Sequence, residues 1–255
     1  MKTIASAPLA ENVMMPQYDR QQLKTRIVHF GFGAFHRAHQ ALLTDRVLNA
    51  QGGDWGICEI SLFSGDRLMR QLREQDHLFT VLEKGANGNQ PIVIGAVNEC
   101  LNATLDSLAA IIEKFCEPQV AIVSLTITEK GYCIDPATGQ LDTQNSRIVH
   151  DLDNPHQPHS APGLLVEALH RRRARGHAPF TVLSCDNIPD NGHVVREAVL
   201  GMAHKRDPAL AQWIAENVTF PGTMVDRIVP AATPESLQEI ADTLGVADPC
   251  AISCE

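Results

Sequence analysis

The chain has 255 residues, of which 44% are hydrophobic and 20% charged, and it carries a net charge of −9. This composition is that of a globular protein able to bury a sizeable core, as one large α/β domain or two small ones. The negative charge argues against nucleic acid and anionic membranes as partners, because both require a basic surface. It leaves room for a small anionic substrate, which needs only a local positive site.

The sequence favours a cytoplasmic protein. No apolar run approaches the ~18 residues of a membrane span, and the N-terminus lacks the apolar core and cleavage site of a signal peptide. The seven cysteines are odd in number and contain no C-x-x-C pair. Most lie in apolar, strand-like runs, so we expect reduced, buried thiols rather than a disulfide framework or a zinc site.

Taken in chain order, the first half of the sequence predicts an arm followed by alternating strands and helices. Residues 1–25 are polar with scattered prolines, and predict a loose arm or a surface wrap. The next runs predict, in turn, a strand, a helix, a strand and a helix, at 27–31, 34–50, 55–61 and 66–75. Two further apolar runs, 78–84 and 91–97, are separated by GANGNQ and predict a hairpin inserted into the β-α pattern.

The second half continues this alternation. The continuous apolar run at 120–128 is typical of a parallel strand covered on both faces, and 179–186 is a second such run. The segment 133–160, rich in Pro, Asp, Asn and His, predicts a long loop, and 220–229 predicts a strand or a loop. Helices are predicted near 105–116, 162–175, 190–205, 208–217 and 234–244. The fold class is therefore α/β, with a Rossmann-like, doubly wound, mainly parallel sheet and a hairpin insertion.

A glycine loop follows the first predicted strand. Gly31 and Gly33 match the first two glycines of G-x-G-x-x-G, while His36 stands at the third position. Glycines allow a sharp turn and a close approach of the backbone to a pyrophosphate, whose charge is favoured at a helix N-terminus. The bulky third residue implies a wider crossing of helix and strand. Two glycines alone are also compatible with an ordinary strand-to-helix turn.

Four motifs occur in order along the chain: GFGAFHRAHQ (31–40), TITEKGY (126–132), SCDN (184–187) and TMVDRIVPAAT (223–233). Together they resemble the long-chain mannitol dehydrogenase family of polyol and sugar-acid dehydrogenases, and most closely its fructuronate reductase (D-mannonate oxidoreductase) branch. The resemblance covers essentially the whole chain after the arm. It implies an NAD-dependent oxidoreductase that transfers hydride between NAD(H) and a sugar acid or polyol, with D-mannonate and D-fructuronate as the best guess. Residues 26–255 would be the NAD-binding Rossmann-like domain.

The glycine loop and the resemblance together suggest the residues that hold NAD, namely Gly31, Gly33, Ala34, Phe35, Asp66 and Lys130. The carboxylate that would accept the ribose hydroxyls has two candidates. Spacing favours Glu59, because this acid is expected ~20 residues beyond the loop, near the end of the second strand. The resemblance favours Asp66, just past that strand, over a plain helix N-cap, and because Asp66 opens a helical run it could do both. Arg67 beside it could hold a 2′-phosphate, so NADP stays open as a minor alternative.

The resemblance also implies three catalytic residues. Asn187 would donate to the reacting oxygen and stabilise the negative charge that builds up during hydride transfer. The turn-rich loop around Asn187 also fits an Asx-type cap. Asp226 would belong to a proton relay, and Glu129 would line the water path or the nicotinamide pocket. Lys130 could serve as a general base if burial lowered its pKa, but the family places its base elsewhere.

In the family, the base is a lysine of a helical C-terminal domain, within the pattern K-x-x-x-x-N-x-x-H. The pattern does not occur in these 255 residues, in which Lys205 is the only lysine after Lys130. We therefore expect the cofactor half of a larger enzyme, with its own C-terminal domain and a small sugar acid or polyol as partners. On its own, this half should have little activity. The alternative is a dinucleotide-binding module without turnover.

Other charged patterns have ordinary explanations. His36 and His39 are three residues apart on a predicted helix, but no further ligands follow at metal-binding spacing and the resembled family works without a metal. We favour support of the loop over cofactor contact for this pair. Arg37 could reach a phosphate or form a surface salt bridge. The run RRRAR at 171–175 predicts a solvated last helical turn that complements the helix dipole.

Overall fold

The computed structural model describes residues 2–86 and 88–255, which form two compact units. The first unit is made of the described residues within 1–26, 31–105 and 226–255, and the second of 27–30 and 106–225. A five-stranded sheet has the strand order β5-β2-β1-β6-β7, and a three-stranded sheet has the order β4-β3-β8. Strand order reverses at β1 (Lys24–Phe30), as in a doubly wound fold. The predicted fold class is confirmed.

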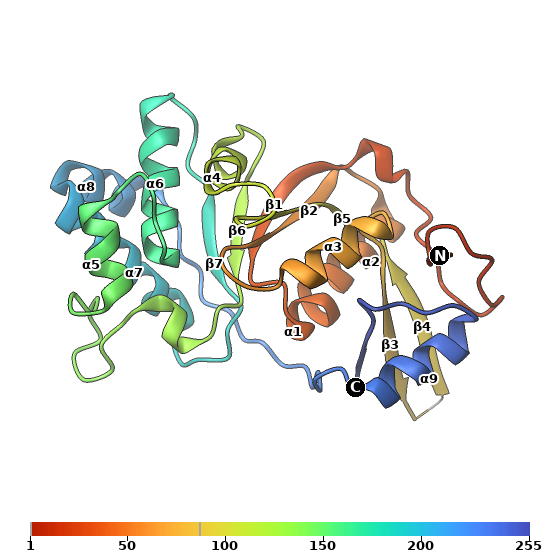
Figure 1. The fold of residues 1–255 in the computed structure, drawn as a ribbon. Helices are drawn as coiled ribbons and strands as arrows, with labels where there is room; N and C mark the ends of the chain where they lie inside the picture. Colours follow the sequence, from red (N-terminus) through yellow and green to blue (C-terminus); the bar gives the residue numbers. More distant parts are fainter. Residues whose placement is uncertain (1, 87) are drawn as a thin grey trace. The chain divides into compact units, whose positions relative to one another are not determined.

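In the second unit, β6 (Ile122–Leu125) lies between the end of β1 and β7 (Thr181–Ser184), and both pairings are parallel. Phe30 is level with Leu125, and Leu125 with Ser184, so the three strands end together. The helices of this unit gather beside β6 and β7 (Figure 1) and are α4 (Leu108–Cys116), α5 (Ser146–Asp153), α6 (Ala161–Ala174), α7 (Asn191–Arg206) and α8 (Pro208–Asn217). Helix α7 packs against β7 and against α5, α6 and α8.

Two predictions for the second unit are wrong in part. The segment 133–160 is not a loop throughout, because it contains α5, which begins after Asn145. The side chain of Asn145 caps this helix by accepting from the Arg147 amide at 3.0 Å. Strand β6 is shorter than its apolar run, since the amides of Ile127 and Thr128 donate to the Asp186 carboxylate instead of to a neighbouring strand.

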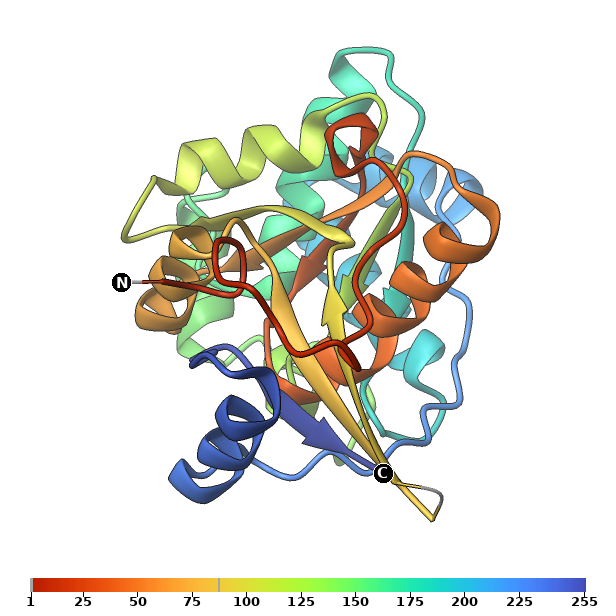
Figure 2. The same ribbon diagram turned by 90° about the vertical axis from the view of Figure 1, so that its right-hand side faces the viewer.

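In the first unit, β2 (Trp55–Ser61) pairs in parallel with β5 (Val97–Asn102). The predicted hairpin is confirmed as the antiparallel pair β3 (Phe79–Gly85) and β4 (Gly88–Ile94), and Asn87 of the expected turn lies outside the described residues. The hairpin continues into a sheet through β8 (Ile252–Cys254), which is parallel to β3. Figure 2 shows these three strands with α9 (Pro234–Leu244), which packs against β4 and β8.

The sequence predicts neither β5 nor β8. The apolar run 91–97 predicts one strand, whereas the chain leaves the hairpin at Gly95 and enters the larger sheet at Val97. Gly95 donates its amide to the buried carboxylate of Asp45 at 2.8 Å, and the Ala96 carbonyl accepts from the Ile57 amide at 2.9 Å. The chain thus changes sheet at the hydrogen bond to the buried Asp45 side chain. The periodicity of the apolar residues does not predict this change. Strand β8 is too short to show a period.

The N-terminal segment forms the surface wrap rather than the loose arm. Within the described residues 2–23, Met14 forms a parallel bridge with Ile92 of β4. The Tyr18 hydroxyl donates to the Asp45 carboxylate, and Arg20 forms an ion pair with Asp76 at 2.7 Å. Met1 lies outside the described residues. The arm is therefore tied to the hairpin side of the first unit by backbone and side-chain bonds.

The predicted helices of the first unit are confirmed. The helix expected at 34–50 runs as α1 (Ala34–His36), a wider π-helical turn η2 (Arg37–Ala41) and α2 (Leu42–Gln51), and ends at Gly52 with φ of +70°. Helix α3 spans Asp66–Glu74. All seven cysteines of the chain are buried, as expected. In the part of the chain that the structure describes, no helix is long and apolar enough to cross a membrane.

The arginine run at 171–175 is not solvated throughout. Arg172 is only 1% exposed. Its guanidinium donates to four backbone carbonyls, those of Phe115, Glu117, Val120 and Ala178, at 2.8–3.2 Å. Two of these carbonyls lie at the C-terminal end of α4, where helical carbonyls lack intrahelical partners. Arg172 therefore joins α6, the end of α4 and the entry to β6 in the core of the second unit.

Replacing Arg172 with Met should lower the free energy of unfolding by at least about 2 kcal/mol, because buried carbonyls lose a charged donor. Arg173→Met is the matched control, since Arg173 is exposed, and it should change stability by no more than about 0.5 kcal/mol. Urea unfolding followed by circular dichroism measures both. Equal losses in the two variants would contradict the assigned role of Arg172.

Candidate functional site

The glycine loop leaves the end of β1 with the geometry that glycine permits. Gly31 has φ of +112°, a conformation that residues with a Cβ rarely adopt. Its amide donates to the Ile60 carbonyl at 3.2 Å, and the Gly33 amide donates to the Gly31 carbonyl at 2.7 Å. Gly33 is the N-cap of α1, so Ala34 and Phe35 are the first two helical residues. Their amides lie in the first turn, where an anion is favoured.

Arg37 supports this loop from inside, so it neither faces solvent nor forms a surface salt bridge. The residue is 6% exposed, and its guanidinium donates to the carbonyls of Gly33 and Cys250. It also lies over the Phe32 ring, at 5.3 Å from the ring centroid. Burial lowers the pKa of Arg37 from its ordinary value. The arginine holds the last carbonyl before the helix in place.

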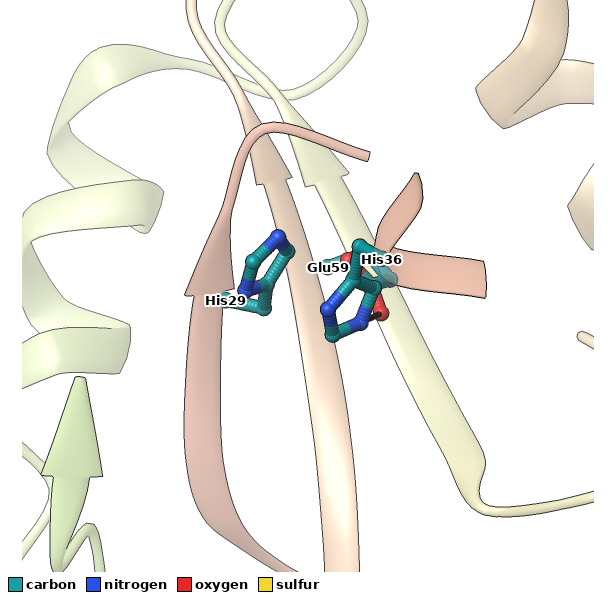
Figure 3. A group of neighbouring side chains, drawn as sticks. All are labelled: His29, His36 and Glu59. Carbon is teal, nitrogen blue, oxygen red and sulfur yellow. Dashed lines mark hydrogen bonds and ion pairs between the residues drawn. The ribbon is translucent and has the colours of Figure 1, made fainter. Parts of the chain in front are cut away.

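His36, at the position of the third glycine, points toward Glu59 of β2 (Figure 3). Both side chains are fully buried, and His36 Nε2 is 2.7 Å from Glu59 Oε1. Burial, and then the neighbouring charges of His39 and Arg37, hold the pKa of His36 well below its usual range. His39 has a different neighbour, since its ring stacks on Phe35 with centroids 4.9 Å apart. The two histidines therefore have different partners.

Asp66 lies at the start of α3, but it is not the N-cap of the helix. Gly65, with φ of +76°, occupies the cap position, and Asp66 is the first helical residue. Both Asp66 and Arg67 are exposed. The loop before them is held by Asn102 at the end of β5, whose amide donates to Ser61 Oγ at 2.9 Å and to the Ser64 carbonyl at 3.1 Å. An exposed carboxylate thus stands on a fixed loop after β2.

In the second unit, the loops after β6 and β7 carry the other expected site residues. Glu129 and Lys130 lie in a 3₁₀ turn, η3 (Glu129–Tyr132), and both are exposed. Asn187 follows β7 and is also exposed. In the described residues the Asn187 side chain makes no hydrogen bond, so it does not cap its loop. The neighbouring Asp186 makes the bonds instead, and the sequence analysis does not single it out.

Asp186 joins the two loops. Its Oδ2 accepts from the Ile127 amide at 3.0 Å and from the Tyr132 hydroxyl at 2.6 Å, and its Oδ1 accepts from the Thr128 amide at 3.0 Å. The Tyr132 hydroxyl also lies 2.7 Å from Ser184 Oγ, at the end of β7. The loops that carry Glu129 and Asn187 are therefore fixed to each other within one unit.

The segment 220–229 contains no helix or strand, so the loop alternative is right. Its course along the second unit is set by Thr223, whose hydroxyl donates to the Ser184 carbonyl at 2.7 Å. Asn191 at the start of α7 donates to Thr223 Oγ1 at 2.7 Å and accepts from its amide at 2.9 Å. Asp226, three residues further on, is exposed. The next residue, Arg227, donates to Glu83 of β3.

Two surface hollows, one in each unit, contain none of the expected site residues. One, of about 700 Å³, is lined by α7, α8 and the loop at 140–143. The other, of about 660 Å³, is lined by the N-terminal arm, α2 and β4. Each unit instead carries its expected site residues on loops that follow parallel strands, where α/β proteins bind their ligands.

Over residues 25–255 the chain matches the sequence profile of the Mannitol dehydrogenase Rossmann domain, and it belongs to this family. It is 80% identical over 255 residues to the uncharacterized oxidoreductase YeiQ of Escherichia coli (strain K12), a match that covers all of this chain and 52% of that protein. It is 57% identical over 257 residues to D-mannonate oxidoreductase of the same organism, again covering all of this chain and 52% of that protein.

A solved structure of Pseudomonas fluorescens mannitol 2-dehydrogenase, a ternary complex with NAD and D-mannitol, superimposes with a TM-score of 0.93 at 42% identity. The match covers 97% of this chain and 51% of that one. The chain thus spans about half the length of the curated relatives it matches. The resemblance inferred from the four motifs is confirmed.

Replacing Gly33 with Val should abolish NADH binding and leave the fold intact. A Cβ built on Gly33 would meet only the Gly31 carbonyl oxygen, at 3.9 Å, and φ of −95° is ordinary for any residue. The branched side chain would nevertheless project where backbone and pyrophosphate should meet. Circular dichroism and an NADH titration on the same sample measure both properties. A folded variant with unchanged affinity would mean that Gly33 serves only the turn.

Proposed function

We propose that this chain is the cofactor-binding part of an NAD-dependent oxidoreductase that transfers hydride between NAD(H) and a sugar acid or polyol. The main support is the Gly31–Gly33 loop, which joins the strand at which sheet order reverses to the N-terminus of a helix. D-mannonate and D-fructuronate are the favoured substrate pair, because D-mannonate oxidoreductase is 57% identical to this chain. The buried cysteine thiols support a cytosolic location.

The order of the sheet suggests how NAD would lie. The pyrophosphate would bind at the glycine loop, and a carboxylate beyond β2 would accept the ribose hydroxyls of the adenosine half. Asp66 fits this role better than Glu59, since Asp66 is exposed and Glu59 is buried against His36. The nicotinamide half would be contacted by residues that the second unit carries on the loops after β6 and β7.

The exposed side chains of those loops would handle charge and protons during the reaction. Bound NAD⁺ supplies the hydride acceptor. The amide of Asn187 would donate to the oxygen of the reacting alcohol and stabilise the charge that develops there. Glu129 and Asp226 are exposed carboxylates suited to relay the proton to solvent, and Lys130 would contact the cofactor. The base that removes this proton would come from the C-terminal domain of the family.

The unmodified chain should bind NADH at least about tenfold more tightly than NADPH, a difference of about 1.4 kcal/mol. Asp66→Ala should erode this preference, because it removes the carboxylate that accepts the ribose hydroxyls and repels a 2′-phosphate. Glu59→Gln is the control, since it alters a buried acid of nearly the same shape and should leave the preference unchanged. Titration of nicotinamide fluorescence measures both affinities. Equal affinity of the unmodified chain for the two cofactors would refute the assignment.

A protein of family length that contains these 255 residues should interconvert D-mannonate and D-fructuronate, whereas this chain alone should turn over only at trace rates. General base catalysis supplies ~10²–10⁴-fold, and one oxyanion donor a further ~10²–10³-fold. NADH absorbance with a panel of hexuronates and polyols measures the rates of both lengths. Asn187→Ala in the longer protein should lower kcat. Robust turnover by the short chain would contradict the proposal, and Lys130 would then be the first base to test.

A further inference from the structure

We infer that Asp186 is a positioning residue that locks the loop 126–132 onto the loop 185–187 and so sets the nicotinamide side of the cofactor site. This inference rests on the proposed function and deepens it. The contacts of the Asp186 carboxylate within the second unit support it.

The loop 126–132 contains a residue in a conformation that normally requires glycine. Thr128 has φ of +64° and ψ of 163°, and a β-branched residue held in this region costs about 1–3 kcal/mol. Such a conformation persists only when its surroundings impose it. It lies directly before Glu129 and Lys130, so it determines the direction in which these two residues leave β6.

The Asp186 carboxylate is what imposes this conformation. It accepts the amides of Ile127 and Thr128, each at 3.0 Å, and these are the two peptide units on the approach to the strained residue. Hydrogen bonds to an ionised acceptor are stronger than neutral ones. The Tyr132 hydroxyl, at 2.6 Å, binds the far end of the same turn to the same carboxylate. Burial and the charge of Asp186 raise the pKa of Tyr132, so its hydroxyl stays a donor at neutral pH.

Asp186 directly precedes Asn187, so its carboxylate links the backbone next to Asn187 to the loop that carries Glu129. Its own backbone is held as well, because its carbonyl accepts from the Asn191 amide at 3.1 Å and its amide lies 3.4 Å from Ser184 Oγ. Any shift of the carboxylate would therefore move Glu129 and Asn187 relative to each other.

The test is Asp186→Asn in the 255-residue chain, with affinities for NADH and for ADP measured by calorimetry. The asparagine side chain keeps one acceptor oxygen but places an NH2 donor where the other carboxylate oxygen accepts a backbone amide. We expect NADH affinity to fall by about tenfold or more, and ADP affinity to stay within about twofold, because ADP lacks the nicotinamide half. Asp190→Asn is the matched control: it makes the same chemical change in the same loop, and Asp190 makes no cap bond to α7. It should bind both ligands normally.

A second variant separates positioning from simple loss of structure. Thr128→Gly removes the conformational cost at φ of +64°, so adding it to Asp186→Asn should recover part of the lost NADH affinity. Unchanged NADH affinity in Asp186→Asn would overturn the inference, and so would equal losses for NADH and ADP or no recovery with glycine. Failure of the unmodified chain to bind NADH would count against the proposed function itself, and the inference would fall with it.

Discussion

The candidate site depends on the level at which three parallel strands end. Phe30 of β1, Leu125 of β6 and Ser184 of β7 are in register, so these three strand ends of the second unit lie level although they are far apart in sequence. Backbone pairing fixes this edge without any contribution from the site residues. The 3₁₀ turn at Glu129 and the loop with Asn187 follow this edge, and Gly31 is the residue after Phe30. The positions of the candidate site residues then depend on the side chains that stabilise these loops.

Each loop is held by one polar side chain that is itself not a candidate to touch the ligand. Arg37 holds the Gly33 carbonyl, Asn102 holds the loop before Asp66, and Asp186 holds the amides that precede Glu129. Buried or half-buried polar groups are costly unless they are bonded, and here their bonds go to loop backbone. The free-energy cost of burying these polar groups is offset by their hydrogen bonds, which hold the loops in place. The exposed residues Asp66, Glu129 and Asn187 can therefore have side chains available for a ligand.

Much of the fold can be predicted from the sequence, because strong apolar periods mark β2, β7 and most helices within a few residues. The elements that escape are those whose position depends on tertiary contacts. Strand β5 begins two residues after Gly95, whose amide donates to the buried Asp45 carboxylate. Helix α5 lies in a segment rich in turn-forming residues, which do not predict a helix. The motifs identify the loops of the site and the family. They do not reveal that Glu59 is buried against His36, that Arg172 lies in the core, or that Asp186 rather than Asn187 ties the loops, since burial and partners arise only in the folded chain.

The most direct test of the whole account is hydrogen exchange of the backbone amides of the unmodified chain, alone, with ADP and with NADH. ADP should slow exchange in the glycine loop at 31–37 and in the loop at 61–67 only. NADH should protect these two loops and, in addition, the loops at 126–132 and 185–188. Protection by NADH that spares the glycine loop, or ADP and NADH patterns that coincide, would contradict the assignment of the loops at 126–132 and 185–188 to the nicotinamide half of the dinucleotide.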